Sequence, residues 1–339
     1  MKRQIFLTVD TECHDYKHVN QYIYGDTKNG ACGLELILQI GKEYGIPINF
    51  FFDVVECKRY GLEYARKIID LIHEYGQPVF FHLHPNYVSD QDQRSYLWDY
   101  TEEEQWQILN EGYETYRKLC GDGERLVFRA GRYGVNEITY KLLSKLGIEV
   151  LDLSYFYGNM KMCHISEDQV KTKNANTLFH GVTVLPNTSY IGLSIGKITH
   201  TFLLNCANST QSEFFQFIRK TKLHHVVYTM HSWDLMKKWF FLPNYVAEDK
   251  RTKRKLIHCI NEAQYNGFEF CSLNKYVYKP EPDELLNLCT GIIGKIRSVA
   301  NNFIRFQKIA MLNKRYLIIF AFFYSLILLS ISFIILLLK

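Results

Sequence analysis

The sequence contains no C-x-x-C pair among its nine cysteines, and this odd number of cysteines is scattered along the chain. It also begins without the hydrophobic region of a secretory signal, because residues 1–3 lead directly into a short predicted strand. A disulfide framework is therefore not expected. Together these absences predict a reducing compartment for the folded part of the protein.

No internal repeat and no low-complexity linker interrupts the first 280 residues. Of the 339 residues, 47% are hydrophobic, which is enough for a large core. The length alone would allow two domains, but single α/β barrels commonly exceed 250 residues. We therefore expect one globular domain, residues 1–280, followed by an appendage.

Acidic residues are absent from residue 285 onward, where seven basic residues occur. Since the whole chain carries a formal charge of +5, residues 1–284 carry a net charge of −2. This charge excludes a nucleic-acid binder, so no nucleic-acid partner is expected. The one dense basic run of the globular part, residues 250–255, is expected to form a solvated helix face.

Apolar strand patterns alternate with helical patterns along the chain. Glycines close several of the helices, and Thr101 with Glu104 forms a capping box at the start of another. This alternation predicts parallel strands with crossover helices, and so a distorted (β/α) barrel. The segment 154–208 shows no regular pattern. We expect strands at 4–12, 46–52, 78–84, 125–128, 148–151, 225–230 and 268–272, and helices at 34–44, 60–75, 101–121, 136–146, 212–222 and 248–265.

Two carboxylates, Asp10 and Glu12, end the first predicted strand. Alternate residues of a strand share a face, so both side chains are expected to point the same way at the carboxyl end of the strand. That edge of parallel sheets is where ligands and chemistry collect. The alternative is a solvated turn that caps the strand.

Two histidines, His82 and His84, end the third predicted strand in the same manner, and Pro85 follows them. Two imidazoles and one carboxylate are the protein ligands of many catalytic zinc sites, which leave a fourth position for water. We therefore predict a divalent metal ion, Zn²⁺ by preference, held by His82, His84 and a carboxylate from the end of the first predicted strand. A structural histidine pair is the alternative.

The order of these motifs resembles that of the NodB-homology polysaccharide deacetylases, over residues 1–275. The resemblance rests on Thr8–Glu12, on His82 and His84, on the turn Arg129–Tyr133 and on Thr229–His231. It implies a distorted (β/α) barrel that removes N- or O-acetyl groups from sugars. The chain departs from the family in having D-x-E for adjacent carboxylates, H-x-H for H-x-x-x-H, and no proline before the tyrosine of the arginine turn.

The resemblance also implies a role for each matched residue. Asp10 is implied as the general base and His231 as the general acid, with Glu12, His82 and His84 as metal ligands. Arg129 would orient Asp10, and the backbone at Tyr133 would bind the oxyanion. Asp152 would orient the catalytic histidine, although an exposed turn is an alternative reading of that residue.

Six aromatic residues follow predicted strands in loops, and they either stack on sugar faces or serve packing. They are Trp98, Tyr100, Tyr155, Tyr157, Trp233 and Trp239.

Residues 316–338 form an uncharged, almost wholly apolar run of 23 residues, long enough to span a bilayer as a helix. Basic residues precede this predicted transmembrane helix and only Lys339 follows it, so the positive-inside rule places the N-terminal domain in the cytoplasm. The protein is thus expected to be a single-pass, tail-anchored membrane protein. Residues 281–315 are expected to form a basic amphipathic linker on membrane lipid, because Ile292, Ile296, Val299 and Phe303 recur at helical spacing.

The sequence as a whole predicts a metal-dependent deacetylase that hydrolyses N-acetyl, or else O-acetyl, groups of a sugar or lipid-linked glycan precursor at the membrane, in polysaccharide biosynthesis. Another metal-dependent amidohydrolase or phosphoesterase is one alternative. A catalytically inactive glycan-binding membrane scaffold is the other.

Overall fold

The computed structural model describes residues 2–13, 16–85, 94–195, 198–239 and 242–290, together with 294, 298, 300–303 and 305. The predicted transmembrane helix, 316–338, lies outside these residues. Within the described ranges no helix combines the length and the apolar character that a membrane span requires.

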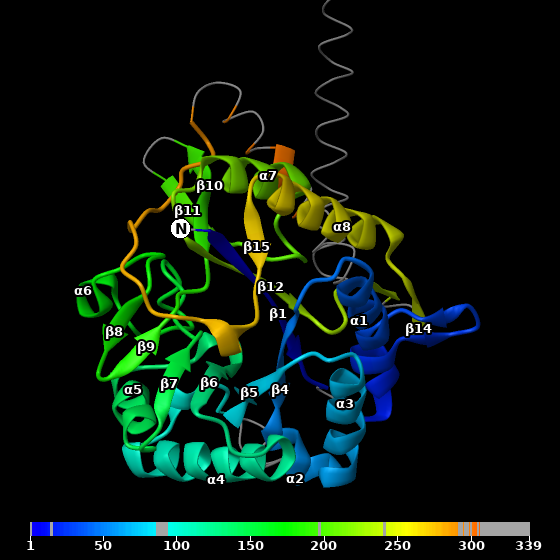
Figure 1. Ribbon diagram of the computed structural model, residues 1–339, viewed down its shortest axis with the longest axis vertical. Coiled ribbons are helices and arrows are strands. Elements are labelled where there is room, and N and C mark those ends of the chain that lie inside the picture. The colour runs from blue at the N-terminus through cyan, green and yellow to red at the C-terminus, as the bar shows by residue number, and fades with distance from the viewer. Residues whose placement is uncertain are drawn as a thin grey trace, which may run out of the picture.

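A nine-stranded sheet forms the centre of the molecule, and helices surround it (Figure 1). Strand β1 lies inside this sheet, between β12 on one side and both β4 and β15 on the other. All pairings in the sheet are parallel except that of β8 with β9. The strands of the sheet are β1 (Arg3–Thr11), β4 (Asn49–Asp53), β5 (Val79–Leu83), β6 (Arg125–Ala130), β7 (Glu149–Asp152), β8 (Thr177–Phe179), β9 (Val182–Val184), β12 (His225–His231) and β15 (Phe268–Phe270).

Three hairpins lie outside the sheet, and helices connect its strands. The hairpins are β2 (Asp26–Thr27) with β3 (Gly30–Ala31), β10 (Ser189–Ile195) with β11 (Ile198–Leu203), and β13 (Met236–Trp239) with β14 (Leu242–Glu248). The helices are α1 (Leu34–Glu43), α2 (Cys57–Tyr60), α3 (Leu62–Glu74), α4 (Glu102–Cys120), α5 (Glu137–Ser144), α6 (Glu167–Val170), α7 (Gln211–Lys220) and α8 (Lys250–Tyr265).

Side chains of β1 alternate between two separate cores. Ile5, Leu7 and Val9 pack in the large outer core beneath the helices. Phe6 packs in a smaller inner core with one or two residues from each neighbouring strand, among them Phe51, Phe80, Val127, Leu151 and Val227. Since side chains alternate along a strand, Thr8, Asp10 and Glu12 follow Phe6 on the inner face. The inner core is therefore the floor of the site.

On one side of β1 the neighbouring strand changes part-way along, and one buried side chain lies where the two neighbours meet. The first half of β1 pairs with β15, whereas its second half pairs with β4. Asn49, at the start of β4, donates from Nδ2 to the carbonyl oxygens of Leu7 and Cys271, both at 3.1 Å. Its Oδ1 accepts from the backbone of Leu273 at 2.8 Å. Asn49 thus satisfies backbone groups that no strand can reach at this point.

The gap between β9 and β12 is closed by the segment that follows β11. Leu204 donates its backbone N–H to Thr188, and Thr229 of β12 donates to Leu204. Cys206 donates in turn to Thr229 at 2.8 Å. These bonds complete the barrel on the side where β12 carries His231.

The opposite end of the barrel is bound by three acidic side chains of one short segment. Glu281 accepts from the backbone of His224 and His225. Asp283 accepts from the backbone of three consecutive residues beginning at Lys173. Glu284 accepts from the backbone of Lys222 at 2.6 Å. Carboxylates bound to backbone donors form strong hydrogen bonds, so this segment belongs to the barrel.

The described part of the expected linker also packs on the barrel. Leu288 donates its backbone N–H to Ile191 of β10. Ser298 and Asn302 both donate to the carbonyl oxygen of Gly192. Contacts with the barrel therefore continue well beyond residue 280, through polar side chains, while Phe303 is 40% exposed.

The expected α/β fold with parallel strands is confirmed, and the capping box of Thr101 and Glu104 begins α4. The segment 154–208, in which no pattern was seen, contains β8 to β11. The β13–β14 hairpin was also missed. Its strands carry charges that obscure the alternation, and it stands apart from the main sheet, so neither face must be wholly apolar.

We expect Asn49→Leu to lower the free energy of unfolding by about 3–5 kcal/mol, because two carbonyl oxygens and one N–H would lose their buried partner. Asn274→Ala is the control, since that side chain is exposed, and it should change stability by about 0.5 kcal/mol or less. Urea unfolding of the protein measures both. Equal midpoints for the two variants would contradict the role of Asn49.

Candidate active site

The residues predicted from four strands meet inside the barrel at the carboxyl ends of those strands. Asp10 lies directly opposite His231 in the pairing of β1 with β12. His82 lies opposite Arg129 in the pairing of β5 with β6. Glu12 and His84 each follow the last residue of their strand, and both are buried. The two strand-end pairs found in the sequence therefore face one another.

Glu12, His82 and His84 form a cluster whose ligand atoms all lie within 4.8 Å of one another. Oε2 of Glu12 is 2.5 Å from Nε2 of His84 and 3.7 Å from Nε2 of His82. The imidazole rings stand edge to face, with centroids 4.9 Å apart. Two imidazole nitrogens and one carboxylate, converging in this way, are a donor set suited to zinc.

The hydrogen bonding of His82 supports a metal site. Its Nδ1 lies 2.8 Å from the carbonyl oxygen of Arg129, which can only accept, so Nδ1 carries the proton. The lone pair of the neutral ring is then on Nε2, which is buried with no hydrogen-bond partner among the described residues. A backbone acceptor that fixes the tautomer in this way is common for metal-binding histidines.

Glu12 remains ionised although it is buried. Burial raises the pKa of its carboxyl, but the charges and hydrogen bonds of His84 and His82 outweigh burial and hold this pKa well below its usual range. An ionised carboxylate is the form that binds a cation.

Gly131, directly after β6, leaves the space that the His84 ring occupies. A Cβ atom at this position would lie 2.4–2.6 Å from three atoms of the His84 ring, closer than atoms can approach. The ring of His84 therefore lies against the bare backbone of the arginine turn. This contact explains why a glycine follows Arg129 and Ala130.

Arg129 is fully buried and holds Asp10 by an ion pair. Its Nη1 donates to Oδ1 of Asp10 at 2.5 Å, and its Nη2 donates to Thr8 and to Asn187. Its Nε donates to the carbonyl oxygen of Leu153, and its Cζ lies over the Phe51 ring, 4.3 Å from the ring centroid. A buried guanidinium paired on every side is rigid, so Asp10 is held in one orientation.

His231 faces the cluster of Glu12, His82 and His84 from β12. Its Nε2 is 3.8 Å from Oε1 of Glu12, and its Nδ1 is 3.8 Å from Oδ2 of Asp234. The same oxygen of Asp234 accepts from the backbone of His231 at 3.0 Å. Trp233 stacks on the imidazole, with ring centroids 4.6 Å apart.

The charges around His231 favour its protonated form. Burial lowers the pKa of this imidazole, but Asp234, together with Asp10 and Glu12, raises it to about 9. A divalent cation beside Glu12 would repel the proton and bring this pKa nearer to neutrality. His231 is thus able to carry a proton into the site at neutral pH.

Comparisons with known proteins bear on the fold. No protein-family model matches the sequence, and no curated protein does. A solved structure from Mycobacterium smegmatis, described as a polysaccharide deacetylase, aligns over 83% of this chain and 96% of its own, with a TM-score of 0.51 and 16% identity. The chain has the polysaccharide deacetylase fold. The resemblance seen in the sequence is confirmed at this level.

Two further structures align less closely. A family 4 carbohydrate esterase from Bacillus subtilis is 14% identical, with 80% of each chain covered and a TM-score of 0.41. A polysaccharide deacetylase from Bacillus cereus is 10% identical, with 82% of this chain and 97% of that chain covered and a TM-score of 0.42.

Within the polysaccharide deacetylase fold of this chain, Asp152 is not where the resemblance implied. It accepts hydrogen bonds from Tyr140 at 2.7 Å and from the backbone and hydroxyl of Ser154. Its neighbour Leu151 occupies the inner face of β7, so Asp152 points outward, toward α5. The acid beside His231 is Asp234, from the same turn, and the expected role of Asp152 is corrected accordingly.

The arginine turn has a strained backbone at Tyr133. Both Arg132 and Tyr133 adopt left-handed conformations, with φ of 54° and 59°. Such conformations are costly outside glycine and often mark functional sites. The Tyr133 ring meets Phe156 edge to face, at 5.7 Å. The predicted oxyanion role of the Tyr133 backbone stays a prediction.

Two buried residues of the site were missed in the sequence. Asn187 holds Arg129 through its Oδ1, and its Nδ2 donates to Leu153 at 2.5 Å. Asp53 ends β4 and accepts from the backbone of His84 at 3.2 Å, while its Oδ2 has no hydrogen-bond partner within the described residues. Burial, opposed by the two histidines, raises the pKa of Asp53 to about 6.

The aromatic candidates divide between packing and the site. Trp98 is held between Tyr96 and His164, and its Nε1 donates to Met162. Tyr100 and Tyr155 are buried, and Tyr157 is partly buried. The Trp239 side chain lies outside the described residues. Trp233 is therefore the candidate that contacts a predicted catalytic group.

We expect Gly131→Ala to weaken divalent-ion binding on the order of 10–100-fold, because the added methyl group displaces the His84 ring. Gly123→Ala is the matched control, since a Cβ there meets only the Arg125 backbone, at 3.3 Å. His82→Ala should abolish binding. Calorimetric titration with Zn²⁺ measures all three, and unchanged affinity in Gly131→Ala would show that His84 is not a ligand.

Proposed function

We propose that the protein is a metal-dependent deacetylase that hydrolyses the N-acetyl group of a sugar or lipid-linked glycan precursor. The observation that carries this proposal is the arrangement around Glu12. Asp10, held by Arg129, lies on one side of the Glu12, His82 and His84 cluster, and a protonated His231 faces that cluster from the next strand. Base, cation site and acid thus share one buried surface.

The hydrolysis of an acetamide requires an activated water, a stabilised oxyanion and a proton for the leaving nitrogen. Glu12, His82 and His84 would hold a divalent cation, which supplies a water of lowered pKa and polarises the acetyl carbonyl. Asp10 accepts the proton of the attacking water, and its ion pair with Arg129 holds its side chain in place.

His231 then delivers a proton to the nitrogen of the sugar. An amine leaves poorly unless it is protonated, whereas an alkoxide leaves more readily. A histidine that is protonated at neutral pH, beside three carboxylates, is suited to the harder of these two tasks. This favours N-deacetylation over removal of an O-acetyl group.

Asp10→Asn and His231→Ala should retain the metal while lowering kcat by about 10²–10⁴-fold, the usual effect of losing a general base or acid. The measurement is acetate release from a panel of lipid-linked and nucleotide-linked N-acetyl sugars. His258→Ala, an exposed histidine, is the control and should be as active as the unmodified protein.

Other outcomes would assign another function. Release of phosphate from phosphomonoesters without any release of acetate would indicate a phosphoesterase. Metal and glycan binding without turnover in the unmodified protein would indicate an inactive scaffold. Loss of the metal in His231→Ala would make this residue a ligand instead of the acid.

We further propose that the protein is tail-anchored, with the barrel in the cytoplasm and a role in polysaccharide biosynthesis at the membrane. The apolar run 316–338 and the basic residues that precede it support this topology. A domain that shares a surface with a lipid-linked substrate gains effective concentration, which a free sugar would not provide.

A membrane-impermeant maleimide added to intact cells should reach a cysteine placed after Lys339 and should miss one placed at the exposed Lys42. The positive-inside rule is the physical reason. Labelling at Lys42→Cys from outside would invert the topology. Permeabilised cells provide the control, since both positions should then react.

A further inference from the structure

The basic run 250–255, expected to be merely solvated, lies at the same end of the barrel as the candidate active site. Helix α8 begins with this run and leads into β15, which pairs with the first residues of β1. The helix therefore ends at the amino ends of the strands and begins near their carboxyl ends, about 24 Å away for 16 residues.

Hydrogen bonds support this placement. Asp249, which caps α8, donates its backbone N–H to Leu235, four residues after His231. Nζ of Lys255 donates to the carbonyl oxygens of Cys206 and Ser209. Cys206 itself is bonded to Thr229, two residues before His231. The first turns of α8 are thus connected to the strand that carries the predicted acid.

Several charges of this run are not neutralised. Lys250, Arg251 and Arg254 are exposed, and none of them forms an ion pair with a residue that the structure describes. Lys253 alone is paired, with Glu248 at 3.2 Å. Three exposed cations on two turns of one helix attract an anionic surface. Because residues 1–284 carry a net charge of −2, this attraction comes from the start of α8 and not from the charge of the whole domain.

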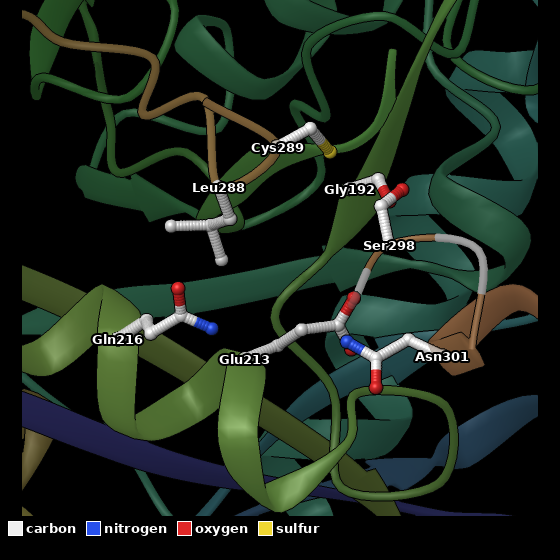
Figure 2. Close-up of a pocket in the computed structure, with 7 residues that line it drawn as sticks. All are labelled: Gly192, Glu213, Gln216, Leu288, Cys289, Ser298 and Asn301. Atoms are coloured by element: carbon white, nitrogen blue, oxygen red, sulfur yellow. The ribbon is translucent and has the colours of Figure 1, made fainter. Parts of the chain in front are cut away.

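Residue 305, the last residue that the structure describes, also lies near the carboxyl ends of the strands. Arg305 is 8% exposed and pairs with Glu213 in the first turn of α7, beside α8. Its Nη2 donates to Tyr190 and its Nε to the carbonyl oxygen of Asn208, while its plane lies 3.9 Å above Phe202. Figure 2 shows Glu213 with Ser298 and Asn301 among the residues that line a narrow crevice.

Residue 305 is thus fixed to the barrel, and 10 residues separate it from the apolar run at 316. Those residues include Lys308, Lys314 and Arg315, with no acidic residue. One basic surface, on α8, therefore lies on the catalytic side of the barrel, and the sequence between residue 305 and the predicted span adds further basic residues.

We propose that Lys250, Arg251 and Arg254 contact the headgroups of an anionic bilayer and thereby turn the mouth of the active site toward the membrane. The occupant of this surface is the lipid bilayer into which the chain is itself anchored. The inference rests on the membrane attachment proposed above. It adds that the substrate is taken at the headgroup level, from a lipid carrier, and not from solution.

The test uses the full chain in two kinds of nanodisc. One contains phosphatidylcholine alone, and the other contains equal parts of phosphatidylcholine and anionic phosphatidylglycerol. A fluorophore is introduced through an unnatural amino acid at His258, one turn beyond Arg254, or at Tyr278, which is exposed at the other end of the barrel. Spin-labelled headgroups are the quencher. We expect quenching at residue 258 in the anionic nanodiscs and little at residue 278.

The triple variant Lys250→Glu, Arg251→Glu, Arg254→Glu should abolish this quenching, because each basic residue near an anionic surface contributes about five-fold to binding. The matched control reverses Lys220, Lys222 and Lys279, three exposed lysines at the opposite end, and should leave quenching unchanged. Equal quenching at both positions, or no effect of the α8 variant, overturns the inference. Failure of the chain to enter nanodiscs overturns it too.

Acetate release from a soluble acetamido sugar separates this inference from the proposed function. The α8 variant should retain that activity, because its residues touch no group of the site. Activity without quenching would refute the orientation and leave the deacetylase proposal standing. Quenching without acetate release from any substrate would refute the deacetylase and leave the membrane contact standing.

Discussion

The buried ion pair between Arg129 and Asp10 is the constraint on which the site depends. A guanidinium with no exposure is costly unless every donor is paired, and the pairing here uses Thr8, Asp10 and Asn187 together with a backbone carbonyl. These partners come from β1, from the residue after β7 and from the segment after β9, so the pair fixes strands on both sides of β6. The orientation of the predicted base follows from how the barrel closes.

Much of the site was visible in the sequence because strand ends are easy to recognise. Asp10, Glu12, His82 and His84 follow apolar runs, and period-two alternation places each pair on one face. Arg129 and His231 were found through the order of motifs, and the structure brings both beside Asp10. The α/β fold was predicted for a similar reason, since parallel strands buried on both faces form clear apolar runs.

The missed features depend on contacts between distant residues. Asn49 and Asn187 bond to backbone groups that come near them only after the barrel closes, and neither stands in a recognisable pattern. Asp53 did carry a signal, since it ends an apolar strand as Asp10 does. Asp152 was misplaced because a strand of four residues gives too few alternations to fix which face its last side chain takes.

The position of β1 has a consequence for how the chain is made. Its partners include β12 and β15, more than 200 residues later in the sequence, and β4 supports only its second half. During synthesis β1 therefore leaves the ribosome long before its partners β12 and β15, and its backbone groups stay unpaired along the edge that β12 will cover. Contacts of such long range form slowly. The carboxylates at the end of β1 offer some protection against association with other chains. A nascent chain of this kind is expected to depend on chaperones until residue 270 has left the ribosome.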